Sequence, residues 1–194
     1  MTRFHCATAY HEVGHVVGYC LLLDGIDQAR VFPKGSKGLM DIDGRPISGC
    51  GGLTEGIGAI SEHHYGPAIS KYPPEWREAL RKRGASDMVV QIMGPLSEAR
   101  YTRASADAVM LTYGHDDMQR VDDIAAWLAA DDVAARVLRN DAWETATQLV
   151  PAHWQKIVAV AEKLASVGVI QGDDALLETI EPAAPLIPPA YKLR

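Results

Sequence analysis

The sequence predicts an α+β fold that is mainly helical and carries a small β-sheet. Two observations support this prediction. Apolar residues recur at helical spacing in a long segment at about 7–24 and again along most of the chain after residue 66. Between them, at about 26–66, short apolar pieces alternate with glycines, which is typical of short strands and tight turns. No internal repeat or low-complexity linker divides residues 1–194, so we expect one domain.

The segment 7–24 predicts a buried helix, because small or apolar residues occupy nearly every face before Asp24-Gly25 ends it. After the glycine-rich region, Pro73-Pro74 predicts the start of a short solvated helix at 76–83. Ser86-Asp87 then predicts the cap of a separate buried helix that ends at Arg100.

The remaining chain is expected to be helical up to an extended tail. A polar loop ending at Gly114 should lead into a helix at 116–130, and Asp131 should cap the next helix. Gly168 should end a later helix, and the proline-rich tail at about 182–194 should be extended.

Composition restricts the class of protein. The chain has 47% hydrophobic and 23% charged residues, and 19 Lys and Arg against 25 Asp and Glu give a net charge of -6. That balance lacks the basic excess of nucleic-acid-binding proteins. Three cysteines are too few for a disulfide framework, and no apolar run approaches the roughly 20 residues that span a bilayer. We therefore expect a cytoplasmic protein without nucleic-acid or membrane partners, and the sequence leaves a homo-oligomer open.

The chemistry-bearing motif is His11-Glu12-Val13-Gly14-His15, an H-E-x-x-H pattern. Side chains four residues apart lie on one helix face, so His11 and His15 can bind a single metal ion. Glu12 lies beside that site without being a ligand. Two neutral imidazoles suit Zn²⁺, which lowers the pKa of water towards about 7, and a neighbouring carboxylate can take up the proton as water attacks a carbonyl.

The surroundings of the motif favour a metal over plain surface histidines. Its neighbours are uncharged, and the helix continues into an apolar run, so three ionisable groups would be buried at a high cost without a partner. A metal ion is such a partner. The alternative is a metal-free site in which His11 and His15 are simply hydrogen-bonded.

A catalytic zinc site requires a third protein ligand. The downstream candidates are His63, His64, Glu98, His115, Asp116, Asp117 and His153. Counting along the helix from Asp117 reaches the apolar stripe Val121, Ile124 and Leu128, whereas counting from Asp116 reaches a largely polar face. Asp117 is therefore the preferred ligand, and its alternative role is to complement the helix dipole. Glu98 and Asp116 are candidates for hydrogen-bonding and orienting a ligand.

These residues resemble a known family. Ala9-Tyr10-His11-Glu12-Val13-Gly14-His15 resembles the zinc helix of the peptidase domain of FtsH-type membrane ATP-dependent proteases. In the same order, Val31-Phe32-Pro33-Lys34-Gly35, the helix at 92–100 and Asp116-Asp117-Met118 are similar to that domain's strand and turn, its following helix and its aspartate-bearing segment. The resemblance implies a zincin-like domain with His11, His15 and Asp117 as zinc ligands and Glu12 as the general base.

The expected function is that of a zinc-dependent metallopeptidase acting on a polypeptide. The sequence departs from that family in having no ATPase motif, so we expect a stand-alone, ATP-independent hydrolase that binds no cofactor besides zinc. The strand near Ala29 to Phe32 could offer an edge to an extended substrate. The competing hypothesis is a catalytically silent zinc-binding interaction module, although it gives no purpose to Glu12.

Overall fold

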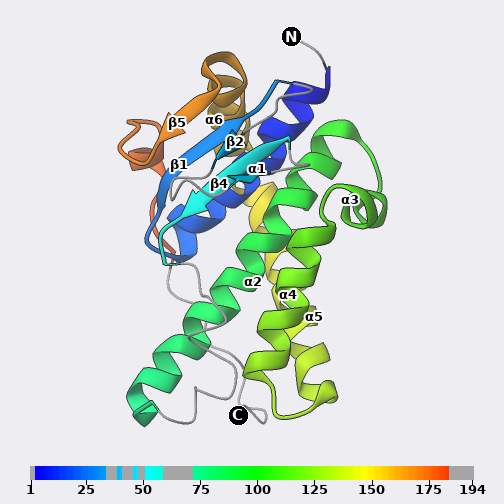
Figure 1. Ribbon diagram of the computed structural model, residues 1–194, viewed down its shortest axis with the longest axis vertical. Helices are drawn as coiled ribbons and strands as arrows, with labels where there is room; N and C mark the ends of the chain where they lie inside the picture. Colours follow the sequence, from blue (N-terminus) through cyan, green and yellow to red (C-terminus); the bar gives the residue numbers. More distant parts are fainter. Residues whose placement is uncertain (1–2, 34–38, 41–45, 48–50, 59–71, 184–194) are drawn as a thin grey trace.

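A computed structural model describes residues 3–33, 39–40, 46–47, 51–58 and 72–183. The described chain is mainly helical with a small antiparallel sheet, which confirms the α+β prediction (Figure 1). The expectations for His63, His64 and residues 184–194 of the tail lie outside the described residues.

Helix α1 (Arg3–Leu22) is the predicted H-E-x-x-H helix. It is buried along most of its length, in agreement with the lack of a polar face in its sequence. Gly25 follows its end with a φ of +91°, a conformation that glycine adopts at little cost. None of the helices in the described ranges combines the length and the apolarity that a bilayer crossing requires.

The sheet has the order β4–β1–β5, with both pairs antiparallel. Strand β1 (Ile26–Val31) lies between β4 (Gly52–Gly56) and β5 (Val169–Gln171). An irregularity between Ile26 and Gln28 shifts the register, which allows Ile26, Ala29 and Val31 all to be buried. A separate pair joins β2 (Leu39–Met40) to β3 (Pro46–Ile47).

The position of β1 corrects one expectation. Both edges of β1 are already paired, so the strand near Ala29 to Phe32 cannot receive a substrate backbone. The sequence reasoning did not identify β5, which follows the left-handed Gly168 cap and returns to pair with β1. The outer strand on the other side is β4.

Helix α2 (Pro74–Thr102) corrects a second expectation. The two helices predicted at 76–83 and 86–100 form one continuous helix of 29 residues. Asp87 does not cap a helix but is completely buried in α2, where it accepts a hydrogen bond from Gln91 and pairs with Arg120. These partners replace the backbone N–H groups that a capping aspartate would bind.

Four more α-helices and one short 3-10 helix complete the described fold. The polar loop expected before Gly114 instead contains helix α3 (Ala106–Thr112), capped by the Ser105 side chain. Helix α4 (His115–Leu128) corresponds to the predicted helix at 116–130. Helix α5 (Asp132–Ala152) has the predicted Asp131 cap, and α6 (Trp154–Val167) ends at Gly168 as expected. A short 3-10 helix, η2 (Leu177–Thr179), follows β5.

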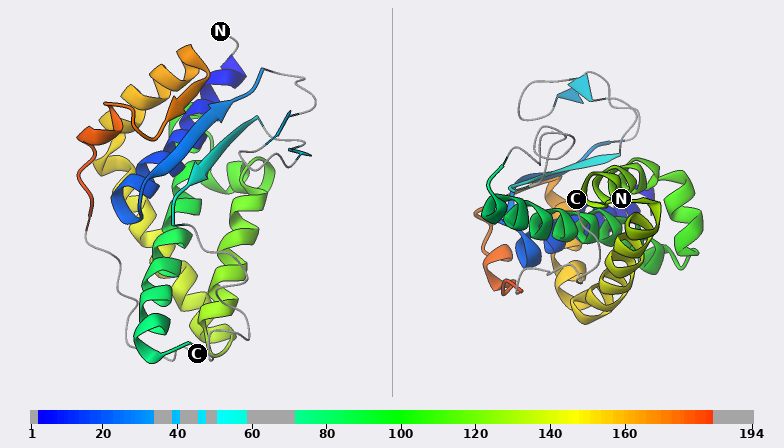
Figure 2. Two further views of the ribbon diagram at one scale, coloured as in Figure 1. Left: turned by 60° about the vertical axis from the view of Figure 1, so that its left-hand side comes forward. Right: turned by 90° about the horizontal axis from the view of Figure 1, so that it is seen from below.

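The sheet lies against α1 and α6, and α1 packs most extensively against α2 (Figure 2). Helices α4 and α5 pack against the other side of α2. Helix α2 therefore separates the sheet-bearing part of the fold from the α4–α5 pair, as the long green helix of Figure 1 shows.

Helices α1 and α2 approach each other closely at Gly14 and Gly94. A Cβ added to Gly14 would lie 2.4 Å from the Met93 carbonyl oxygen and 2.7 Å from the Gly94 Cα. A Cβ added to Gly94 would lie 2.3 Å from Nε2 of His15. The crossing thus has no room for a side chain on either helix, and it holds the H-E-x-x-H segment directly against α2.

Gly14→Ala should destabilise the protein by about 2 kcal/mol, because overpacking at the crossing exceeds the roughly 1 kcal/mol that alanine gains in helix propensity. Gly18→Ala is the matched control, since its added Cβ would lie no closer than 3.1 Å to its nearest neighbours, which are atoms of Val90 and Met93. Urea unfolding of both variants checks the prediction. Equal stability of the two variants would contradict it.

Candidate metal centre

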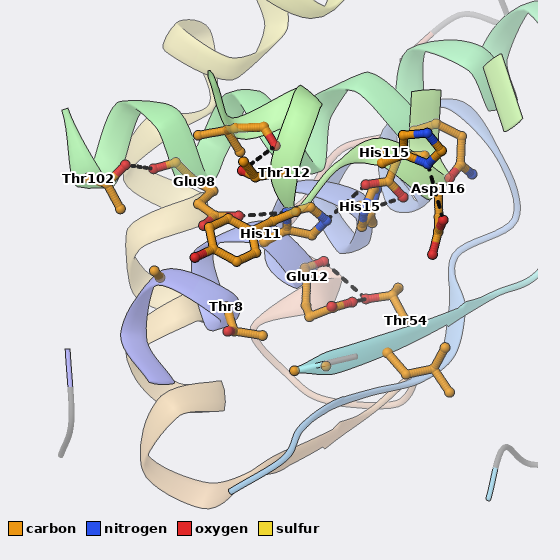
Figure 3. Close-up of a pocket in the computed structure, with 18 of the residues that line it drawn as sticks. Thr8, His11, Glu12, His15, Thr54, Glu98, Thr102, Thr112, His115 and Asp116 are labelled. Atoms are coloured by element: carbon orange, nitrogen blue, oxygen red, sulfur yellow. Dashed lines mark hydrogen bonds and ion pairs between the residues drawn. The ribbon is translucent and has the colours of Figure 1, made fainter. Parts of the chain in front are cut away.

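The candidate site lies in a cleft of about 1110 Å³ whose lining comes from α1, α2, α3, α4 and β4. Helix α1 supplies His11, Glu12 and His15 from one face, as expected for positions one turn apart. Figure 3 shows these side chains directed into the cleft, with Glu98 approaching from α2 and Thr54 from β4. All three of these α1 residues are less than one-tenth exposed.

His11, His15 and Asp117 form a cluster with the composition of a metal site. Nε2 of His11 lies 3.0 Å from Oδ2 of Asp117, and Nε2 of His15 lies 3.5 Å from Oδ1 of the same carboxylate. One ligand atom from each residue lies within 4.8 Å of the other two. The structure therefore brings together the two histidines and the aspartate that the sequence singled out.

The other nitrogen of each imidazole is held by an acceptor. Nδ1 of His11 donates to Oε2 of Glu98 at 2.9 Å, and Nδ1 of His15 donates to the Val90 carbonyl at 2.9 Å. Because these acceptors hold a proton on Nδ1, the neutral form of each ring has its lone pair on Nε2. Both Nε2 atoms face Asp117, which is the arrangement that ligating histidines adopt around a metal.

Asp117 reaches the cluster because α4 begins against α2. Gly114 precedes α4, and an added Cβ there would lie 2.6 Å from the Pro95 ring. The apolar stripe Val121, Ile124 and Leu128 is completely buried, and Asp117 continues this stripe into the first turn with an 18% exposed side chain. Asp116 has a fully exposed side chain, which lies 3.6 Å from Nδ1 of His115.

Glu12 lies in the same cleft but outside the ligand cluster. Its Oε2 accepts a hydrogen bond of 2.8 Å from the Thr54 hydroxyl, which also lies 3.1 Å from the Glu12 backbone carbonyl oxygen. Burial raises the pKa of the Glu12 carboxyl, and the nearby histidines and the Thr54 hydrogen bond oppose that shift. Glu12 is therefore a buried carboxyl group, hydrogen-bonded to strand β4 beside the cluster of His11, His15 and Asp117.

The charges of the cluster favour a cation at its centre. Burial lowers the pKa of His11, but hydrogen bonds to Asp117 and Glu98 outweigh burial and raise this pKa to about 10. Burial opposes ionisation of Asp117, yet His15 and His11 lower its pKa. Without a metal, the positive charge that balances the carboxylates of Asp117 and Glu98 is that of the His11 imidazolium.

The other described candidate ligands contribute no ligand atom to the cluster. His115 is largely exposed beside Asp116 at the mouth of the cleft, and His153 lies at the junction of α5 and α6, away from the lining. Glu98 contacts the far nitrogen of His11 rather than joining the ligand atoms. His63 and His64 lie outside the described residues.

Sequence reasoning missed Thr54, Tyr19 and Gln91, which also line the cleft. Tyr19 lies two turns after His11 on the same face of α1, so helical spacing could have identified it. Thr54 alternates with Gly52 and Gly56 along a strand, which places these residues on one face. The contact of this β4 face with Glu12 depends on the pairing of β4 with β1, which the local sequence does not reveal.

Comparison with known proteins gives no assignment of this chain. No protein-family model matches the sequence, and no curated protein matches it significantly.

Asp117→Ala should weaken zinc binding much more than Asp116→Ala, because only Asp117 reaches both histidines. Loss of a group that merely orients a ligand typically costs about 10–100-fold in metal affinity, and loss of Asp117 should exceed that range. Competition with a chromogenic chelator measures the affinities. Equal losses in the two variants would show that Asp117 is not a ligand.

Proposed function

We propose that this protein is a zinc-dependent metallopeptidase with a zincin-like site. The proposal rests on one observation, which is that the cleft contains both a set of metal-ligand side chains and a separate carboxyl group that is not a ligand. His11, His15 and Asp117 converge through ligand atoms, whereas Glu12 lies beside them, buried and held by Thr54 instead of joining them. A purely structural metal site has no use for such a carboxylate. The resemblance of the α1 motif to the FtsH-type zinc helix favours the same function.

The donor set suits zinc. Two imidazole nitrogens and one carboxylate are ligands that Zn²⁺ accepts, and three protein ligands are the number typical of catalytic zinc sites. Glu98 and the Val90 carbonyl hold the two rings in the tautomer that binds a metal through Nε2. We propose that His11, His15 and Asp117 hold the ion and that Glu98 orients His11.

When bound, zinc supplies a Lewis acid that polarises a carbonyl and makes water more acidic. Glu12 then acts as the general base, because its carboxylate can accept a proton from the water that attacks the scissile carbonyl carbon. As the C–N bond breaks, Glu12 returns this proton to the leaving nitrogen. Water is thereby consumed, and the products are a carboxylic acid and an amine.

Strand β4 is suited to receive the polypeptide. It is the outer strand of the described three-stranded sheet, and Gly52, Leu53 and Thr54 line the cleft. An extended peptide could add to such an edge through backbone hydrogen bonds. We propose for β4 the role that was expected of β1, and a peptide added to this strand would lie next to Glu12.

Protein purified without added metal should contain about one zinc per chain, as expected for a single three-ligand site. The double variant His11→Ala/His15→Ala should contain none, whereas His153→Ala, outside the cleft, should bind zinc normally. Elemental analysis of the three proteins checks this prediction. Unchanged zinc in the double variant would refute the ligand assignment.

Glu12→Gln should retain zinc and the fold but lose hydrolysis of a peptide library. The substitution preserves size and removes the basic carboxylate, and loss of a general base typically costs about 10²–10⁴-fold in rate. ATP should not affect either protein.

Two outcomes would contradict the proposed function. Cleavage at the wild-type rate in Glu12→Gln would refute the role of Glu12. A wild-type protein that binds zinc but cleaves nothing would favour the silent zinc-binding module.

A further inference from the structure

We propose that Thr54 is a positioning residue for Glu12, which it holds from the outer strand of the sheet through a hydrogen bond to one carboxylate oxygen. The inference rests on the proposed function and adds a second element to it. In this arrangement α1 supplies the base and β4 determines where its carboxylate points.

The contact between Thr54 and Glu12 joins two segments 42 residues apart in the chain. The Thr54 hydroxyl lies 2.8 Å from Oε2 of Glu12 and 3.1 Å from its backbone carbonyl oxygen. A hydroxyl has a single proton, so the two acceptors share it, with the shorter distance on the carboxylate. The same hydroxyl therefore links β4 to the backbone of α1 and holds the carboxyl end of the Glu12 side chain.

Gly52 provides the second constraint on Glu12. A Cβ added at Gly52 would lie 2.6 Å from Cγ and 2.6 Å from Oε1 of Glu12. The strand backbone thus lies directly on the Glu12 side chain, two residues before Thr54 on the same face of the strand. The strand confines the stem of the side chain and the hydroxyl fixes its end.

Positioning matters for a glutamate because its terminal torsion is broad and does not define the direction of the oxygens. With Oε2 held by Thr54, rotation of the carboxylate is restricted and Oε1 keeps a defined direction. A misplacement of about 1 Å in a reacting group can cost on the order of 10²-fold in rate. The hydroxyl should therefore affect the chemical step and leave zinc binding unaffected, since none of the ligand atoms belongs to Glu12 or Thr54.

Thr54→Val removes the hydroxyl at nearly constant volume. We expect kcat to fall about 10–100-fold. We expect KM to change less than about threefold, because the lost contact does not bind substrate. Zinc content should stay at the wild-type level. Thr54→Ser should restore most of the rate. Thr145→Val, whose hydroxyl donates to the Asp141 carbonyl within α5, is the matched control with unchanged activity.

A double-mutant cycle tests the contact independently of catalysis. Thr54→Val leaves the Glu12 carboxylate buried without its donor, whereas the double variant with Glu12→Ala leaves no such group. The fall in Tm of the double variant should therefore be smaller than the sum of the falls in the single variants. Thermal unfolding is measured with zinc and with excess chelator.

The outcomes separate the inference from the proposed function. If the wild type cleaves peptides and Thr54→Val does so at the same rate, or if its loss is not restored by Thr54→Ser, the positioning role is refuted. Additive Tm shifts would also refute it. If the wild type cleaves nothing, the proposed function fails, and with it the catalytic meaning of the contact, even where the Tm shifts are not additive.

Discussion

The close crossing of α1 and α2 at Gly14 and Gly94 is the constraint on which the rest of the structure depends. Because neither helix has a side chain there, the ring of His15 rests on Gly94 and reaches the Val90 carbonyl. The same approach brings Glu98 to His11, one turn before His15. A wider separation would leave both imidazoles without the acceptors that hold a proton on Nδ1. The same helix packing thus forms part of the core and fixes the orientation and tautomer of the two histidines.

Burial of this many ionisable groups is costly unless their charges are complementary. His11 lies between Glu98 and Asp117, and these carboxylates raise its pKa to about 10 despite its burial. The cluster therefore holds a positive charge whether it comes from a proton or from a metal ion. A divalent cation bound at Nε2 of His11 would replace the proton there and pair with Asp117, while the Nδ1–H of His11 would still donate to Glu98. The proposed metal-bound form would therefore keep the contacts of the metal-free form.

The predictable parts of the fold and site are those that depend on helical periodicity. The spacing of His11 and His15 and the stripe that begins at Asp117 place these side chains without knowledge of their partners. The errors arose where distant contacts override local signals. Asp87 looks like a helix cap in sequence, but its pairing with Arg120 allows α2 to continue through it. The pairing of β5 with β1, and the contact of Thr54 with Glu12, join segments whose local sequences carry no sign of one another.

Strand β4 links the two parts of the proposed function, which are substrate binding at its edge and orientation of Glu12. Its inner edge is paired with β1, its face rests on Glu12 through Gly52 and Thr54, and it is the outer strand of the described sheet. A peptide that added to its outer edge would stiffen the strand that orients the general base. Movement of β4 and orientation of Glu12 are therefore coupled by contact. In the proposed mechanism, a substrate backbone on this edge would hold Glu12 most firmly in place, which would favour extended polypeptides over small amides.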